Sequence, residues 1–261
     1  MQDPFVSCQD PTPIIRHAEL GSTNAEAQRL ASRGEQGPLW IIAERQTAGR
    51  GRSGRSWQEA SGNLFASLLV SLWCEPKEAS RLSILAGIAL AKAVETAGLN
   101  SENQTGQPPP SLKWPNDLMF GTAKAAGILV ETQQQTSGAL ACIIGIGINV
   151  ASSPEVADRP VTSLAETGYS GVTPDILIQH LDLQIRAGLA TMAREGGFSQ
   201  ITQTWMTYAH PIGTPISVKS GDTTIEGEFA GLADDGALLL DQKGQRTSIS
   251  YGDVSDPHRV I

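Results

Sequence analysis

The chain has 261 residues and a formal net charge of −8, with 40% hydrophobic and 18% charged residues. This balance is typical of a globular protein with one large domain, or with a large and a small one. The acidic total argues against a general nucleic-acid binder, which would carry a basic face.

The cysteines indicate the compartment. Cys8, Cys74 and Cys142 are widely spaced and form no Cys-x-x-Cys pair, which favours a reducing cytosol over a disulfide scaffold. The first residues show no basic segment followed by an apolar run, so we expect no signal peptide. The most apolar stretch, 139–151, is too short to span a bilayer. We therefore expect a cytoplasmic protein with no membrane partner.

The first hundred residues are predicted to contain helices and strands in alternation. Residues 1–13 carry three prolines and are predicted to be a flexible tail, which leaves no room for a separate DNA-binding domain before Ile14. Thr23 and Glu26 have capping-box spacing, which predicts a helix through about Ser32. Further on, apolar patterning predicts strands at 39–43 and 64–72 and an amphipathic helix at 80–98, with Gly98 at its end.

The middle of the chain is predicted to complete the larger domain. Residues 100–110 are polar and end in three prolines, which is typical of a surface loop. Strands are predicted near 127–131 and 140–150, and helices at about 174–192 and 198–208. The strand at 140–150 is apolar on both faces, so we expect it to be central and buried.

The composition changes near His210. Beyond it, short alternating apolar segments are separated by Gly-Asp, Asp-Gly and Lys-Gly turns, which predicts a small β-meander or barrel. A unit of this size buries little core and is expected to lean on the larger domain. The predicted organisation is a tail (1–13), a large domain (14–209) and a C-terminal β unit (210–261).

The segment from Arg45 to Trp57 is the most unusual part of the sequence. It holds four arginines and three glycines between Arg45 and Arg55, without an acidic residue. Glycines let backbone N–H groups turn toward a ligand, and arginines bind carboxylate or phosphate. We interpret it as a flexible clamp for a small anion. Its GxGxxG pattern fits a dinucleotide site poorly because no helical periodicity follows, and a solvated surface loop is the simpler alternative.

A second cluster joins Lys113 to Leu118 and Lys124 to Glu131. The lysines could pair with phosphate or carboxylate groups. Asp117 could orient an amine or help to hold a metal. The alternative is a Pro-Asn-Asp turn between two strands, with the lysines in solvent.

Two further segments suit a ligand site. The small residues of Gly145–Val150 would let a ligand or another backbone approach a buried strand, and Asn149 could bind a base or phosphate. The alternative is a core strand weakened by glycine. Gly21–Asn24 has the residues of a helix N-cap, and the same groups can bind a polar head group.

Together these four segments resemble the biotin protein ligase family, the biotin–[acetyl-CoA-carboxylase] ligases. The resemblance covers about residues 14–261. One departure is Ser53, at a position that is often arginine in relatives. Family members that also repress transcription carry an N-terminal winged helix, and this chain resembles the ligase-only type. The matching segments are the glycine-rich loop at 49–57, KWPND at 113–117, KxxGILVE at 124–131 and GxGIN at 145–149.

The resemblance implies an α+β fold and a two-step reaction. The fold is a mixed β-sheet flanked by helices, similar to class II aminoacyl-tRNA synthetases, with a small C-terminal SH3-like β-barrel. Biotin and ATP would give biotinyl-5′-AMP, and a lysine of a biotin carboxyl carrier protein of acetyl-CoA carboxylase would then take the biotin. The first step joins two anions, so cationic side chains and Mg²⁺ are required to cancel their repulsion.

The resemblance also assigns roles to residues, and the ligands of Mg²⁺ stay unknown. Catalytic roles fall to Lys124, Arg52 and Asp117. Biotin is expected to contact Ser22, Thr23, Asn24, Gln46, Arg50, Gly51, Arg52, Lys124 and Gly127. The nucleotide is expected to contact Arg50, Arg52, Arg55, Trp57, Lys113, Asn116 and Asn149.

Alternatives stay open at this point. A lipoate or octanoate ligase shares the scaffold, although the arginine-rich loop and KWPND favour biotin. A non-catalytic nucleic-acid-binding module is opposed by the net charge of −8. The sequence leaves the oligomeric state open, a homodimer included, and does not assign a role to the C-terminal β unit.

Overall fold

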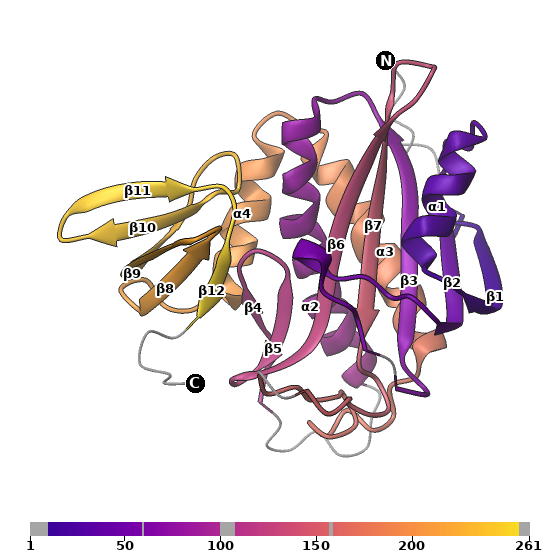
Figure 1. The fold of residues 1–261 in the computed structure, drawn as a ribbon, viewed down its shortest axis with the longest axis horizontal. Helices are drawn as coiled ribbons and strands as arrows, with labels where there is room; N and C mark the ends of the chain where they lie inside the picture. The colour runs from indigo at the N-terminus through magenta and orange to yellow at the C-terminus, as the bar shows by residue number, and fades with distance from the viewer. Residues whose placement is uncertain (1–9, 59, 100–107, 157–158, 256–261) are drawn as a thin grey trace.

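The computed structural model of the protein describes residues 10–58, 60–99, 108–156 and 159–255 (Figure 1). Most of the predicted tail, with Cys8, lies outside the described residues, as do residues 100–107 of the predicted surface loop. No helix in the described part of the chain is long and apolar enough to cross a membrane.

The larger unit is built on a mixed seven-stranded sheet with the order β1-β2-β3-β7-β6-β5-β4. Only β1 and β2 run parallel, and the other neighbours are antiparallel. β7 lies in the middle and is almost entirely buried, as its apolar run predicts. The strands are β1 Ile14–Leu20, β2 Leu39–Gln46, β3 Leu64–Leu72, β4 Ser111–Lys113, β5 Asp117–Phe120, β6 Ala123–Gln134 and β7 Leu140–Ile148.

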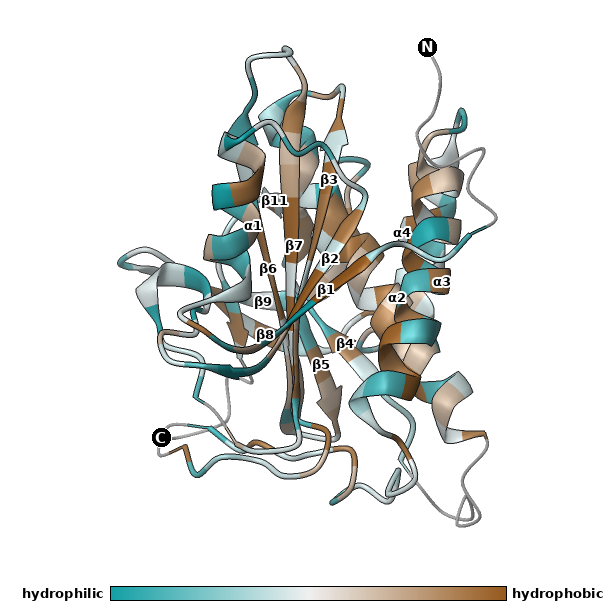
Figure 2. Cartoon of the chain, turned by 90° about the vertical axis from the view of Figure 1, so that its right-hand side faces the viewer, coloured by the Kyte–Doolittle hydropathy of each residue, from teal (hydrophilic) through white to brown (hydrophobic). Residues whose placement is uncertain are grey.

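Helices cover both faces of this sheet unequally (Figure 2). α1 (Thr23–Ser32) covers one face over a small apolar cluster. On the other face α2 (Arg81–Gly98) packs against α3 (Pro174–Met192) and α4 (Gly197–Tyr208), above the main core. α2 is apolar almost all round because it lies between the sheet and the other two helices.

The C-terminal unit is a five-stranded antiparallel sheet with the order β11-β10-β9-β8-β12. Its inner side chains belong to the same core as the larger unit. The rings of Trp205 in α4 and Phe229 in β9 meet edge-on at 6.4 Å. The expectation of a small antiparallel β unit packed on the larger one is confirmed. The strands are β8 Pro215–Ser220, β9 Thr223–Leu232, β10 Leu238–Gln242, β11 Gln245–Ile249 and β12 Asp253–Ser255.

One local prediction was wrong. Ser22, not Thr23, is the N-cap of α1, so Ala25, which has no carboxylate, lies at the third helical position and no capping box forms; Glu26 pairs with Arg29. The predicted end of α2 at Gly98 is confirmed. Gly98 is small because the ring of Tyr169 packs on it, so that an added Cβ would lie 2.5 Å from the ring.

Three strands of the larger unit were not anticipated. β1 carries no clear alternation because it is an edge strand whose side chains are mostly exposed. β4 and β5 are only three and four residues long, which is too short for an apolar period to show. β4 and β5 flank the Pro-Asn-Asp turn, so the turn between two strands that was considered as an alternative is present.

Candidate active site

The four sequence segments meet at one cavity of about 210 Å³ on the larger sheet, beside the C-terminal unit. Arg50, Arg52 and Lys124, which are far apart in sequence, all line it. Of the other predicted site residues, all but Asn149 also line it. These are Ser22, Thr23, Asn24, Gln46, Gly51, Arg55, Trp57, Lys113, Asn116, Asp117 and Gly127.

A buried ion pair lies at the base of the cavity. Lys124 in β6 donates from Nζ to Oδ1 of Asp117, the first residue of β5. Lys113, at the end of β4, lies 3.4 Å from Oδ2 of the same carboxylate. The β4–β5 turn and the register of β5 on β6 bring the three together. Lys124 is only 8% exposed, so the alternative that leaves both lysines in solvent is wrong for Lys124.

Burial and charge act in opposite directions on this pair. Burial favours the neutral acid, but Lys124 and Lys113 together outweigh it and hold the pKa of Asp117 below its usual value. Burial also lowers the pKa of Lys124, and the attraction of Asp117 offsets this only in part. A second anion beside Lys124 would therefore stabilise its charged form, which is the property that an anion-binding lysine requires.

Three glycines make room for side chains above the sheet. A Cβ on Gly145 would lie 2.1 Å from Oδ1 of Asn24, and one on Gly147 would lie 2.7 Å from the ring of Trp57. Gly127, paired with Gly147 across β6 and β7, is equally close to that ring. The glycines of β7 thus admit close approach, as predicted, and do more than weaken a core strand.

Polar groups gather where α1 begins. Gln46 accepts hydrogen bonds from the N–H and the hydroxyl of Thr23, at 2.8 and 3.2 Å. Ser67 in β3 lies 2.7 Å from Oγ1 of Thr23 and 2.6 Å from Oδ1 of Asn24. Asn24 donates to Glu131 at 2.7 Å. This ordered set of donors and acceptors suits a polar head group at a helix N-terminus.

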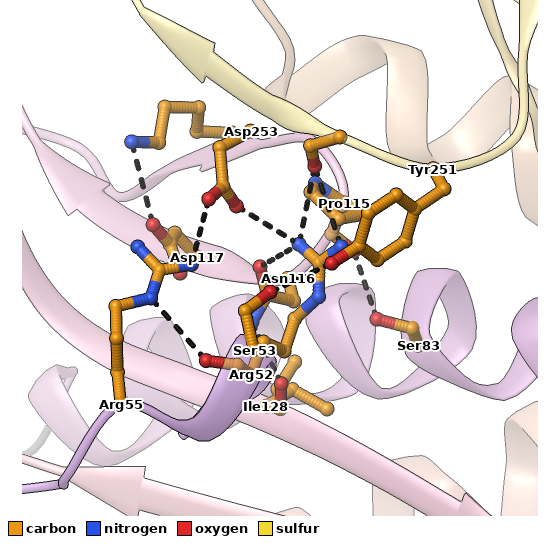
Figure 3. A network of polar contacts seen from close by, with 12 residues as sticks. Arg52, Ser53, Arg55, Ser83, Pro115, Asn116, Asp117, Ile128, Tyr251 and Asp253 are labelled. Carbon is orange, nitrogen blue, oxygen red and sulfur yellow. Dashed lines mark hydrogen bonds and ion pairs between the residues drawn. The ribbon is translucent and has the colours of Figure 1, made fainter. Parts of the chain in front are cut away.

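Residues of the arginine loop line the cavity, and Figure 3 shows Arg52 and Arg55 of this loop beside Asp253. Arg50 pairs with Glu131 of β6 at 3.1 Å. Arg52 opens a short 3₁₀ turn, η1 (Arg52–Gly54), and donates to Asn116 at 3.2 Å. The guanidinium of Arg55 reaches Asp253 of the C-terminal unit at 2.7 Å. The arginines of the loop are therefore paired with acidic or amide side chains, although much of the loop is exposed.

Asn149 lies apart from the other predicted residues. It lines an adjoining cavity of about 300 Å³, which also touches Trp57 and Lys124. Its amide donates to the carbonyl of Thr162 at 3.0 Å. Within the described residues its buried Oδ1 has no hydrogen-bond partner, and neither does Nε1 of Trp57. Buried polar atoms without a partner are uncommon and are suited to a ligand.

Three residues of the site were missed by the sequence analysis. Ser67 is a fully buried serine in β3, a strand whose other polar residue is Ser71; a serine inside a run predicted to be a buried strand is the signal that could have identified it. Arg159 lines both cavities, and Asp253 lines the larger one. Both belong to segments of ordinary composition, so no pattern singled them out.

Metal ligands are scarce among the residues described. No group of three or more His, Cys, Asp or Glu side chains there could hold a metal ion. The two acids on the cavity, Asp117 and Asp253, already face lysine and arginine side chains. A divalent cation would therefore need most of its ligands from a bound substrate.

Comparisons with known proteins agree with this site. Residues 19–149 match the Biotin/lipoate A/B protein ligase family, and residues 212–255 match the Biotin protein ligase C terminal domain. The chain is 35% identical to a biotin–[acetyl-CoA-carboxylase] ligase of Paracoccus denitrificans, over 91% of this chain and 98% of the relative. The chain belongs to the biotin protein ligase family.

Other members of this family are similar over most of their length. A biotin–[acetyl-CoA-carboxylase] ligase of Mycobacterium tuberculosis is 32% identical over 91% of this chain and 86% of its own. The solved biotin protein ligase of Aquifex aeolicus, in complex with biotin and ATP, superposes with a TM-score of 0.74 and 27% identity. That match covers 93% of this chain and 97% of the solved one, so the predicted fold class is confirmed.

Proposed function

We propose that this protein is an ATP-dependent biotin protein ligase. It activates biotin as biotinyl-5′-AMP and transfers the biotin to a specific lysine of the biotin carboxyl carrier protein of acetyl-CoA carboxylase. The observation that supports this most strongly is the convergence of Arg50, Arg52 and Lys124 on one cavity of a biotin protein ligase fold. The relatives named above are biotin–[acetyl-CoA-carboxylase] ligases.

The first step brings a carboxylate to a triphosphate. Their mutual repulsion must be cancelled before the carboxylate oxygen can reach the α-phosphorus, and fixed cations do this without reorganising during the reaction. Lys124 is buried beside Asp117 and is the cation best held in place. We assign it, with Arg50 and Arg52, to neutralising the two substrates as they meet.

Biotin has a polar ring at one end and a carboxylate at the other. The ring suits the hydrogen-bonding groups of Ser22, Thr23, Asn24 and Gln46 at the start of α1. The carboxylate would then point toward Lys124, past Gly51 and Gly127, which both line the cavity. Glycine at 127 lets Lys124 and Trp57 pack closely there.

The nucleotide would occupy the cationic half of the cavity. Arg55 and Lys113 are placed to meet phosphates, while Trp57 offers a ring on which adenine can stack. Asn116 donates to Ile128 and accepts from Arg52, so it would act mainly by orienting that arginine. The adjoining cavity with Asn149 extends the nucleotide site. Mg²⁺ would enter as the MgATP complex, held chiefly by phosphate oxygens.

The second step needs a neutral lysine amine, although the unperturbed pKa of lysine is about 10.4. Two roles are open to Asp117 in this step: positioning the amine, or accepting its proton. Because two lysines hold the pKa of Asp117 below its usual value, it is a weak proton acceptor. We therefore assign it the positioning role.

A direct test is to incubate the protein with biotin, MgATP and a biotin carboxyl carrier domain. We expect the mass of one biotinyl group on a single lysine, and none without ATP. A competition between biotin and lipoate for the same carrier separates this function from a lipoate or octanoate ligase. Preferred transfer of lipoate would contradict the proposal.

A further inference from the structure

The tip of the arginine loop is held by the C-terminal unit, about 200 residues further along the chain (Figure 3). Asp253, the first residue of β12, accepts from Arg52 through Oδ1 at 3.3 Å and from Arg55 through Oδ2 at 2.7 Å. One carboxylate thus bridges two arginines of the loop that covers the cavity.

Two neighbours of Asp253 strengthen this contact. The carbonyl of Gly252 accepts from both terminal nitrogens of Arg52, at 3.3 Å each. The hydroxyl of Tyr251 lies 2.7 Å from Oγ of Ser53, and its ring lies under the guanidinium of Arg52, 5.3 Å from ring centroid to Cζ. We call Tyr251, Gly252 and Asp253 the loop anchor.

Arg52 also connects the loop anchor to residues at the base of the cavity. Arg52 also donates to Asn116 at 3.2 Å, and Asn116 donates to the carbonyl of Ile128 in β6 at 2.7 Å. Arg52 is the better buried partner, with a side chain 17% exposed, against 49% for Asp253. A single guanidinium therefore joins the C-terminal unit to the sheet on which the substrates would lie.

We propose that Asp253 and Tyr251 are positioning residues that keep the arginine loop over the bound adenylate, a role that rests on the proposed ligase function. The adenylate is a reactive mixed anhydride, so an enzyme that makes it must retain it away from water and stray amines. Asp253 does this through Arg52 and Arg55. The C-terminal unit thus sets how long the intermediate stays bound.

Loss of the Asp253 carboxylate should affect retention of the adenylate and formation of the adenylate differently. Asp253 is an anion at the edge of a cationic cavity, so its removal does not weaken the attraction of the site for ATP. The loop, however, loses its two ion pairs with Asp253. Arg52 keeps the Gly252 carbonyl, the Tyr251 ring and Asn116 as partners, and Ser53 keeps the Tyr251 hydroxyl. Removal of Asp253 should therefore accelerate adenylate release by a larger factor than it changes the initial rate of adenylate formation or the KM for ATP.

The test follows release of the adenylate from the full-length protein. The complex is formed with biotin and MgATP, freed of excess ligand by rapid gel filtration, and sampled for free adenylate and for biotin on added serum albumin. We expect Asp253→Asn to speed release about three- to tenfold, the scale of two partly exposed ion pairs, and Tyr251→Phe about twofold. High salt should reduce the difference in adenylate release rate between wild type and Asp253→Asn, because it screens the ion pairs.

Controls separate anchoring from a general loss of structure. Asp253→Glu should restore slow release, and Asp222→Asn, in the exposed turn between β8 and β9, should leave it unchanged. Tyr251→Phe tests the proposal even if Asp253→Asn fails to fold. Equal release rates for wild type, Asp253→Asn and Tyr251→Phe would overturn the anchor alone. A wild-type protein that forms no adenylate would overturn the proposed function and the anchor with it.

Discussion

The base of the cavity and the loop above it both carry cationic side chains, but they are built differently. Lys124 and Asp117 are buried side chains on neighbouring strands, with residue exposures of 8% each. In the loop, the side chains of Arg50 and Arg55 are 43% and 45% exposed, and that of Arg52 is 17% exposed. Breaking a buried pair costs about 3–5 kcal/mol, whereas an exposed pair contributes about 0–1 kcal/mol.

The difference assigns separate tasks to the two regions. A buried cation in a fixed position can stabilise charge that develops during reaction, because it needs no reorganisation. Weak, exposed pairs can open and close, which a site needs in order to admit substrates and then retain an intermediate. Substitutions in the base should therefore act mainly on the chemical step, and substitutions in the loop should have a larger effect on retention of the adenylate.

The largest effect is expected for Lys124→Ala. It removes the best-held cation from the site, so adenylate formation should fall about 10²- to 10³-fold, as for the loss of one transition-state donor. Biotin-dependent pyrophosphate release measures this, and circular dichroism checks that the fold persists. Lys219→Ala, on an exposed position of β8, is the matched control. Near-normal pyrophosphate release would remove Lys124 from the mechanism.

A smaller loss is expected for Gly145→Ala. The new methyl group would lie 2.1 Å from Oδ1 of Asn24, so Asn24 must move and the head-group site is distorted. Overpacking of this kind costs about 1–3 kcal/mol, which corresponds to roughly a 10- to 100-fold loss of biotin affinity. Isothermal titration calorimetry measures this biotin affinity. Gly21→Ala, whose methyl group would meet open space, should bind biotin normally; equal affinities would contradict the assigned head-group site.

Arg52→Gly tests the loop directly. The substitution removes every contact of the loop with Asn116 and part of its contact with Asp253, so the adenylate should escape about tenfold faster or more, on the scale of several charge-assisted hydrogen bonds. Biotin on bystander proteins, detected by streptavidin blotting, reports the escape. Arg33→Gly, an exposed position after α1, should leave bystanders unlabelled. Unchanged selectivity of Arg52→Gly would rule out the clamp.

The stability contributed by the ion pair at the base of the cavity should depend on pH. Since the folded-state pKa of Asp117 is lowered, its ionised form stabilises the fold. That contribution is fully present above the unfolded-state pKa of about 3.9, and it is lost as the pH falls through the lower folded value. Urea unfolding between pH 7 and pH 2 should show a shallower acid dependence for Asp117→Asn than for wild type. Identical pH slopes would show that the pair does not couple to folding.

The smallest effect is expected for Ser53→Ala, which removes one exposed hydrogen bond to Tyr251. Adenylate release should rise less than about twofold. In a Tyr251→Phe background the same substitution should add nothing, because the two hydroxyls act as one pair. Additive effects in this double-mutant cycle would place Ser53 and Tyr251 in separate roles.

The base of the site could be predicted from sequence better than the loop contacts. Hydrophobic periodicity predicted the positions of β3 and β7 closely. The glycines of β7 indicated that another group packs closely on this strand, but they did not indicate which side chains do so. The family resemblance supplied Lys124 and Asp117. The C-terminal anchor could not be predicted, because Asp253 lies 201 residues from Arg52 and nothing in its neighbourhood signals an interaction. Arg159 was missed for the same reason, and Ser67 was hidden in an apolar strand.

The central claim is that cations from separate segments allow biotin and ATP to react in this cavity. Exchange of labelled pyrophosphate into ATP tests it most directly, because the exchange requires reversible formation of an acyl adenylate. We expect exchange in the wild-type protein only when biotin is present, and little in Lys124→Ala. Exchange that does not depend on biotin, or that persists undiminished in Lys124→Ala, would contradict the claim.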